Sequence, residues 1–123
     1  MLAELADVSL DEFLARTDRR NIFDIWQGKA GKGDHFSLHD ARPIARAMFA
    51  ELFDRDVVML GNGVTAAFGF KCPMFTWAVN GESGATWSWS PHPSGINRWW
   101  NEPANRARAS AFWRSAINRS VQS

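Results

Sequence analysis

The sequence predicts an α+β fold in which a four-stranded antiparallel meander, at about 57–90, packs against an amphipathic helix at about 41–55 and against helices at both ends of the chain. Three observations lead to this fold class. Apolar residues recur at helical spacing before residue 56 and again near the C-terminus, whereas in between they alternate as in strands. Short glycine-rich segments separate the alternating stretches. The length of 123 residues, with 46% hydrophobic and 22% charged residues, predicts a single globular domain over 1–123.

The first helix has two independent start signals. Ser9 and Glu12 have the spacing of a capping box, in which the serine side chain accepts a hydrogen bond from the first turn. Val8 and Phe13 occupy the two positions of a hydrophobic staple around the same turn. The sequence therefore predicts a helix over about 10–16.

The segment 21–27 fits a short helix or a short strand, and the sequence leaves both open. For the next helix, at about 41–55, Asp40 is the predicted N-cap because Pro43 then falls in the first turn. A start at Ser37 would place this proline in the helix interior, at a cost of about 3 kcal/mol. One broad apolar stripe follows on this helix, formed by Ile44, Ala45, Met48, Phe49, Leu52 and Phe53.

Between these helical segments, 28–33 is a glycine- and lysine-rich stretch that predicts a flexible loop. Backbone N–H groups with two lysines can form an anion-binding nest, here at Lys29, Gly31 and Lys32. The stretch is not a P-loop, because glycine rather than serine or threonine follows the second lysine.

After residue 56 the sequence predicts two hairpins. The first pairs 57–60 with 64–70 through a glycine turn, and the second pairs 74–79 with 85–90. Within the last strand Trp87 and Trp89 share one face of the sheet. We expect both indoles to be largely buried beneath the helix at 41–55 or the last helix.

The proline-containing segment 91–95 ends the sheet, and Asn101 and Pro103 open a final helix that runs to about Ser120. At about 100° per residue, one side of this helix is apolar, and arginines flank it on both edges. The apolar side consists of Ala109, Phe112, Trp113, Ala116, Ile117 and Val121.

Tryptophan is the most informative residue type, since the chain has seven tryptophans and no tyrosine. Trp99 and Trp100 are adjacent, so in regular structure they cannot both face one core, and we expect one of them at the surface. An exposed indole beside a guanidinium and amides is typical of a binding surface. The predicted patch consists of Asn97, Arg98, Trp99, Trp100, Asn101 and Arg108.

No catalytic or metal-binding motif has the required spacing. His35 and His39 are four residues apart, but a helix that starts at Asp40 leaves both in the preceding loop, so we expect no metal and no cofactor. A metal or hydrolytic role would require His92 to fold back to meet them. Cys72 lacks a recognisable base and is predicted to be a packed thiol.

The distribution of charge and the cysteine content restrict the class of partner and the cellular compartment. Residues 1–56 carry eleven acidic and eight basic side chains, whereas 57–123 carry two and six, so an anionic partner would meet the C-terminal half. One cysteine, no signal peptide and no long apolar run predict a cytoplasmic protein without a membrane span.

The leading hypothesis is a small non-enzymatic interaction protein, of an accessory, inhibitor or immunity type common in phage and mobile elements, that binds a protein partner through the patch. One alternative is a small hydrolase that uses His35, His39 or His92. A second is a single-stranded nucleic-acid binder that stacks bases on the exposed indole. The same patch would also suit the seam of a homodimer.

Overall fold

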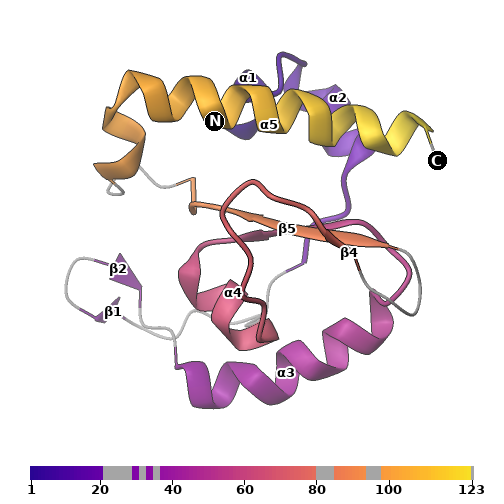
Figure 1. Cartoon of the computed structure of the whole chain (residues 1–123), viewed down its shortest axis with the longest axis vertical. Coiled ribbons are helices and arrows are strands. Elements are labelled where there is room, and N and C mark those ends of the chain that lie inside the picture. The colour runs from indigo at the N-terminus through magenta and orange to yellow at the C-terminus, as the bar shows by residue number, and fades with distance from the viewer. Residues whose placement is uncertain (21–28, 31–32, 35–36, 80–84, 94–97, 123) are drawn as a thin grey trace. The chain divides into compact units, whose positions relative to one another are not determined.

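The computed structural model describes residues 1–20, 29–30, 33–34, 37–79, 85–93 and 98–122 (Figure 1). Contacts divide the chain into two compact units. Unit 1 combines Met1–Arg20 with Pro93–Ser123, and unit 2 is Asn21–His92. The division does not test whether 1–123 folds as one domain, which stays a prediction.

Unit 1 is helical. It contains α1 (Leu2–Leu5), α2 (Leu10–Arg16), the short 3₁₀ helix η1 (Arg98–Asn101) and the long α5 (Pro103–Gln122). Figure 1 shows α5 running alongside α1 and α2, and α5 contacts both. The helices from the two ends of the sequence therefore pack against each other in unit 1.

The bounds predicted for α2 are confirmed, and so is its cap. The side chain of Ser9 accepts a hydrogen bond from the backbone N–H of Glu12 at 3.1 Å. The carboxylate of Glu12 forms an ion pair with Arg16 one turn later. Local signals therefore determine where this helix begins.

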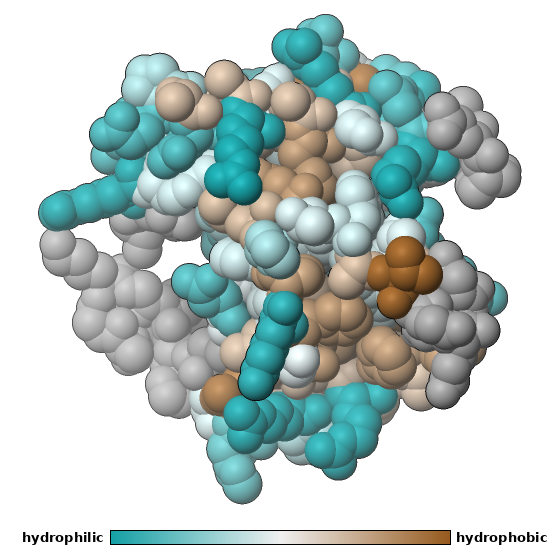
Figure 2. Space-filling model, viewed as in Figure 1, coloured by the Kyte–Doolittle hydropathy of each residue, from teal (hydrophilic) through white to brown (hydrophobic). Residues whose placement is uncertain are grey.

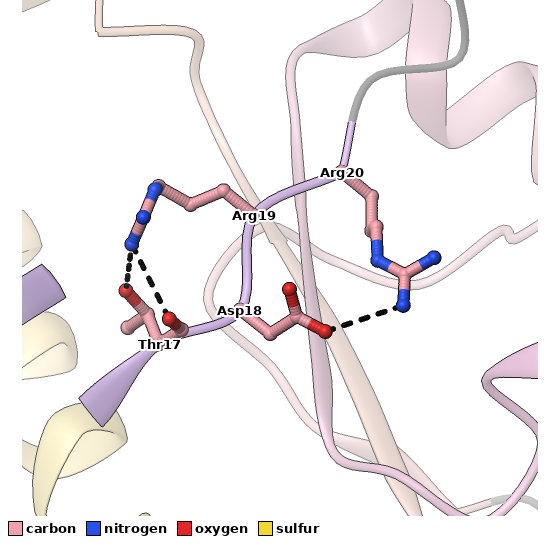
Figure 3. Close-up of polar contacts among 4 residues, drawn as sticks. All are labelled: Thr17, Asp18, Arg19 and Arg20. Atoms are coloured by element: carbon pink, nitrogen blue, oxygen red, sulfur yellow. Dashed lines mark hydrogen bonds and ion pairs between the residues drawn. The ribbon is translucent and has the colours of Figure 1, made fainter. Parts of the chain in front are cut away.

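The C-terminal end of α2 is held by polar contacts (Figure 3). Arg19 donates from Nη1 to the carbonyl and hydroxyl oxygens of Thr17 at 3.2 and 3.1 Å. The same nitrogen donates to the carbonyl oxygen of Leu14 at 3.3 Å. A cation at this end also complements the helix dipole. The neighbouring Arg20 pairs with Asp18 at 3.4 Å.

The apolar side predicted for the last helix forms the core of unit 1. Ala109, Phe112, Trp113 and Ile117 are all buried. The rings of Phe13 and Trp113 lie 6.2 Å apart, which joins α2 to α5. A hydrogen bond joins α1 to α5, because the Ser110 hydroxyl donates to the carbonyl oxygen of Leu5 at 2.8 Å.

Unit 2 contains a sheet of three described strands in the order β3–β5–β4. β3 (Val57–Leu60) runs parallel to β5 (Thr86–Ser90), and β4 (Ala78–Val79) runs antiparallel to β5. The predicted mixture of helices and strands is confirmed. The predicted four-stranded antiparallel meander is not, because the sheet is mixed and one predicted strand is a helix.

That helix is α4 (Asn62–Phe68), where a strand over 64–70 was predicted. Gly61 precedes it with φ of +93°, and Gly69 ends it in the left-handed region with φ of +75°. Glycine adopts both conformations without strain. The glycines therefore bound a helix rather than close a hairpin, and the Thr65 hydroxyl donates to the Gly61 carbonyl at 2.8 Å.

The second predicted hairpin is confirmed only near its loop, since β4 is two residues long rather than spanning 74–79. Phe75 has φ of +61°, which interrupts an extended strand. A turn also forms there, because the N–H of Thr76 donates to the carbonyl of Pro73 at 3.1 Å. This turn still contacts β5, because the Phe75 N–H donates to the Trp89 carbonyl at 2.9 Å.

The helix α3 (Leu38–Glu51) begins and ends before its predicted bounds. Ser37 is the N-cap, and its hydroxyl accepts from the N–H of Asp40 at 3.3 Å, so the prediction that Asp40 caps the helix is wrong. Pro43 consequently lies inside the helix. Its missing N–H removes a single bond, to the carbonyl of His39, and the added turn with its serine cap offsets that loss.

Trp87 is the centre of the unit 2 core, as predicted, with 0% of its surface exposed. Phe70 stacks on it at 5.1 Å with an interplanar angle of 4°. Phe49 from α3 and Phe68 from α4 each lie 5.2 Å from it. The prediction that Trp89 is also largely buried is wrong, because it is only half-buried. Its indole N–H donates to the carbonyl oxygen of Cys72 at 2.7 Å.

The glycine- and lysine-rich stretch is not wholly a loop. β1 (Lys29–Ala30) pairs antiparallel with β2 (Gly33–Asp34), with Lys29 opposite Asp34. The open choice between helix and strand at 21–27 lies outside the described residues.

Candidate functional site

The candidate site is the 3₁₀ helix η1 and the first turns of α5 in unit 1. The rings of Trp99 and Trp100 meet edge-on, with centroids 4.7 Å apart and an interplanar angle of 85°. Trp100 is buried, with 4% of its surface exposed, whereas Trp99 is half-buried. The expectation that the two indoles occupy different environments is confirmed.

Backbone contacts fix this turn against the helix that follows. The side-chain amide of Asn105 donates to the carbonyl oxygen of Trp99 at 2.9 Å. The carbonyl of Glu102 accepts from the N–H of Arg106 at 3.1 Å, so α5 begins directly after η1. Pro103 occupies the first helical position, where its missing N–H costs nothing.

The side chains around Trp99 are polar and accessible. Arg98 and Asn101 are exposed, and so is Arg108, which follows Asn105 by three positions on the helix. Residues three apart on a helix lie on neighbouring parts of its surface. We call the set Arg98, Trp99, Asn101 and Arg108 the Trp99 surface. Asn97 was predicted to belong to it but lies outside the described residues.

Burial changes the role of one predicted site residue. Trp100 packs inside unit 1, so it supports the surface rather than contributing contact area to it. Asn105 was not among the predicted residues, although it holds the backbone of Trp99. An asparagine in the first turn of a helix that follows a tight turn was the signal available in the sequence.

Chemically, the Trp99 surface offers one large apolar plate with hydrogen-bond donors beside it. The guanidinium groups of Arg98 and Arg108 donate only, and the amide of Asn101 both donates and accepts. Because the backbone of Trp99 is already fixed, its indole loses little conformational freedom when a partner binds. Such a surface can bind a partner, but it supplies no nucleophile or base.

Of the four residues considered for catalysis, the structure describes His39, Cys72 and His92. His39 is exposed near the start of α3, and His92 is exposed after β5. His35 lies outside the described residues, and Cys72 is half-buried. Among the residues that the structure describes, no group of three or more histidine, cysteine or acidic side chains is arranged to hold a metal ion.

Two further predictions concern an anion-binding loop and the absence of a membrane-spanning helix. Of the predicted anion-binding residues, Lys29 lies in β1, and Gly31 and Lys32 lie outside the described residues. None of the described helices is long and apolar enough to cross a membrane.

Comparison with protein-family models, with curated proteins and with solved structures gives no match to this chain. The function is therefore inferred from the Trp99 surface.

Proposed function

We propose that the chain is a small non-enzymatic binding protein, of an accessory or inhibitor type, that holds a protein partner on the Trp99 surface. The observation that carries the proposal is the unequal burial of two adjacent indoles. Trp100 is fixed in the core of unit 1, and it holds Trp99 edge-on at the surface. Residues that dominate the affinity of protein interfaces are enriched in tryptophan and arginine, both of which this surface presents.

The pre-formed geometry favours binding. Ordering a flexible side chain costs about 0.5–1.5 kcal/mol when a partner binds. The turn at Trp99 already has its backbone carbonyl bonded to Asn105 and its ring packed against Trp100, so much of that ordering precedes binding. Arg98 and Asn101 supply hydrogen bonds at the rim, where interfaces are polar.

The hydrolase alternative has no comparable support in the described residues. A catalytic base must be oriented by packed neighbours and lie within hydrogen-bond reach of a nucleophile or substrate. His39 and His92 are both exposed, and each comes from a different part of unit 2. The binding function is therefore the better supported of the two.

Photo-crosslinking at the surface tests the proposal. p-Benzoylphenylalanine replaces Arg98, and as a matched control it replaces Arg42, which is exposed on α3. We expect a protein partner to be crosslinked at residue 98 and not at residue 42. Crosslinking to a second copy of the chain would instead make the surface a homodimer seam, and crosslinking to nucleic acid would support the single-stranded alternative.

The affinity of the crosslinked partner is then measured at two salt concentrations. Packing of an indole depends little on salt, whereas contacts to phosphates lose affinity steeply as salt rises. We therefore expect affinity to change little with salt. Affinity that follows the salt concentration steeply, or crosslinking only from residue 42, would overturn the proposal.

A further inference from the structure

The outer face of α5 shares Arg108 with the Trp99 surface and extends beyond it to Arg114. Between Pro103 and Gln122 the helix carries four arginines and no acidic residue. The exposed charges of α3 are mixed, since Asp40 and Glu51 accompany its arginines. A helix face with charges of only one sign attracts a partner of the opposite sign.

The arginines border a strip of small side chains. At about 100° per residue, Arg108 and Arg114 lie about 120° apart around the helix, with Ala111 midway between them. All three are exposed. Four further residues within about 40° of this midline are exposed and small or short, namely Ala104, Ala107, Ser115 and Asn118. Figure 2 shows the corresponding mixture of hydrophilic and weakly hydrophobic side chains over α5.

We propose that the outer face of α5 binds duplex DNA, with the helix in the major groove. This activity goes beyond the binding of a protein partner by the Trp99 surface. An α-helix with its side chains is about 10–12 Å across, and the major groove is about 12 Å wide. Arginines on the two edges of the helix then reach the phosphates of the two strands, while the small side chains face the base edges.

Two features favour a duplex over other anionic partners. A single strand is bound by stacking its bases on aromatic side chains, but the aromatic residues of α5, Phe112 and Trp113, are buried. An acidic protein surface has no fixed spacing of its charges, whereas two phosphate rows separated by a groove match two edges of one helix. The small strip also permits the close approach that a groove requires.

Fluorescence anisotropy with a labelled duplex of about 20 base pairs tests the proposal at about 50 and about 200 mM salt. The double variant Arg108→Ala/Arg114→Ala should lose at least tenfold in affinity at the lower salt. The slope of log affinity against log salt should shrink by about 1.8, because each lost phosphate contact removes about 0.9. The melting temperature should stay unchanged, since both side chains are exposed.

The matched control is Arg42→Ala/Arg46→Ala, which removes the same charge from exposed positions on α3. It should change the affinity less than twofold. Equal losses in both double variants would show that binding follows total charge, and would overturn the proposal. The single variant Arg114→Ala lies outside the Trp99 surface, so its effect is separate from the test of the protein-binding function.

Other outcomes also decide against the proposal. It fails if the wild type does not bind the duplex at the lower salt, or if it binds a single strand of the same length as tightly. It fails in favour of an acidic polypeptide if poly-L-glutamate displaces the duplex at equal concentration of charges. A loss confined to Lys29→Ala/Lys32→Ala would move the DNA-binding site to the β1–β2 pair.

Discussion

The start of α2 in unit 1 and the sheet in unit 2 differ in the sequence distance between the residues that determine them. In unit 1, α2 begins where Ser9 caps Glu12, three residues away. In unit 2, the carboxylate of Asp56 accepts from the backbone N–H and the hydroxyl of Thr86, 30 residues away, at 2.8 and 2.9 Å. This pair joins the starts of β3 and β5 and favours their parallel pairing. A local signal thus determines where α2 begins, whereas a long-range contact supports the pairing of β3 with β5.

The largest loss of stability should follow a substitution in the core of unit 2, where residues distant in the sequence meet. Trp87 is fully buried among three phenylalanines, so Trp87→Ala removes a large apolar side chain and leaves a cavity. We expect the free energy of unfolding, measured in urea, to fall by about 3–5 kcal/mol. A variant with an unchanged melting temperature would show that unit 2 does not depend on this core.

Replacing one proline in each unit should have different effects on stability. Pro43 lies inside α3, so Pro43→Ala restores a backbone hydrogen bond and should raise stability by about 1–3 kcal/mol. Pro103 is the first residue of α5, and Pro103→Ala should change stability by less than about 0.5 kcal/mol. Thermal unfolding of both variants tests the pair. A loss of stability in Pro43→Ala would mean that the proline assists the helix where it stands.

The smallest effects should come from the two serine caps. Ser9→Ala and Ser37→Ala each remove the acceptor of one backbone N–H, at 3.1 and 3.3 Å respectively. Each should cost about 1 kcal/mol, measured by urea unfolding. If Ser37→Ala costs nothing, Asp40 can replace it as the cap, as the sequence alone suggested.

The fold was predictable where a signal and its target lie within one turn of helix. The bounds of α2 and the buried side of α5 follow from capping and periodicity. The helix α4 was not predictable in this way, because Gly61 fits a hairpin turn as well as the start of a helix, and Gly69 was assigned to the predicted strand 64–70. The parallel pairing of β3 and β5 depends on Asp56 and Thr86, which no local pattern connects.

The candidate site was predictable in outline. Adjacency alone indicated that Trp99 and Trp100 would separate between surface and core, but not which one would be buried. That depends on the packing of η1 on α5 and on the bond from Asn105 to the turn. The exposed small strip of α5 was missed because the arginines were considered without the side chains between them.

Paired measurements on the two adjacent indoles test the central claim most directly. The stability of Trp99→Ala and Trp100→Ala is compared with their affinity for the partner crosslinked at residue 98. Trp99→Ala should lower the melting temperature less than Trp100→Ala does, and it should lose at least about 2 kcal/mol of binding, or about 30-fold. Trp100→Ala should lower the melting temperature, because its ring is buried. A Trp99→Ala variant that binds the partner as the wild type does would contradict the account.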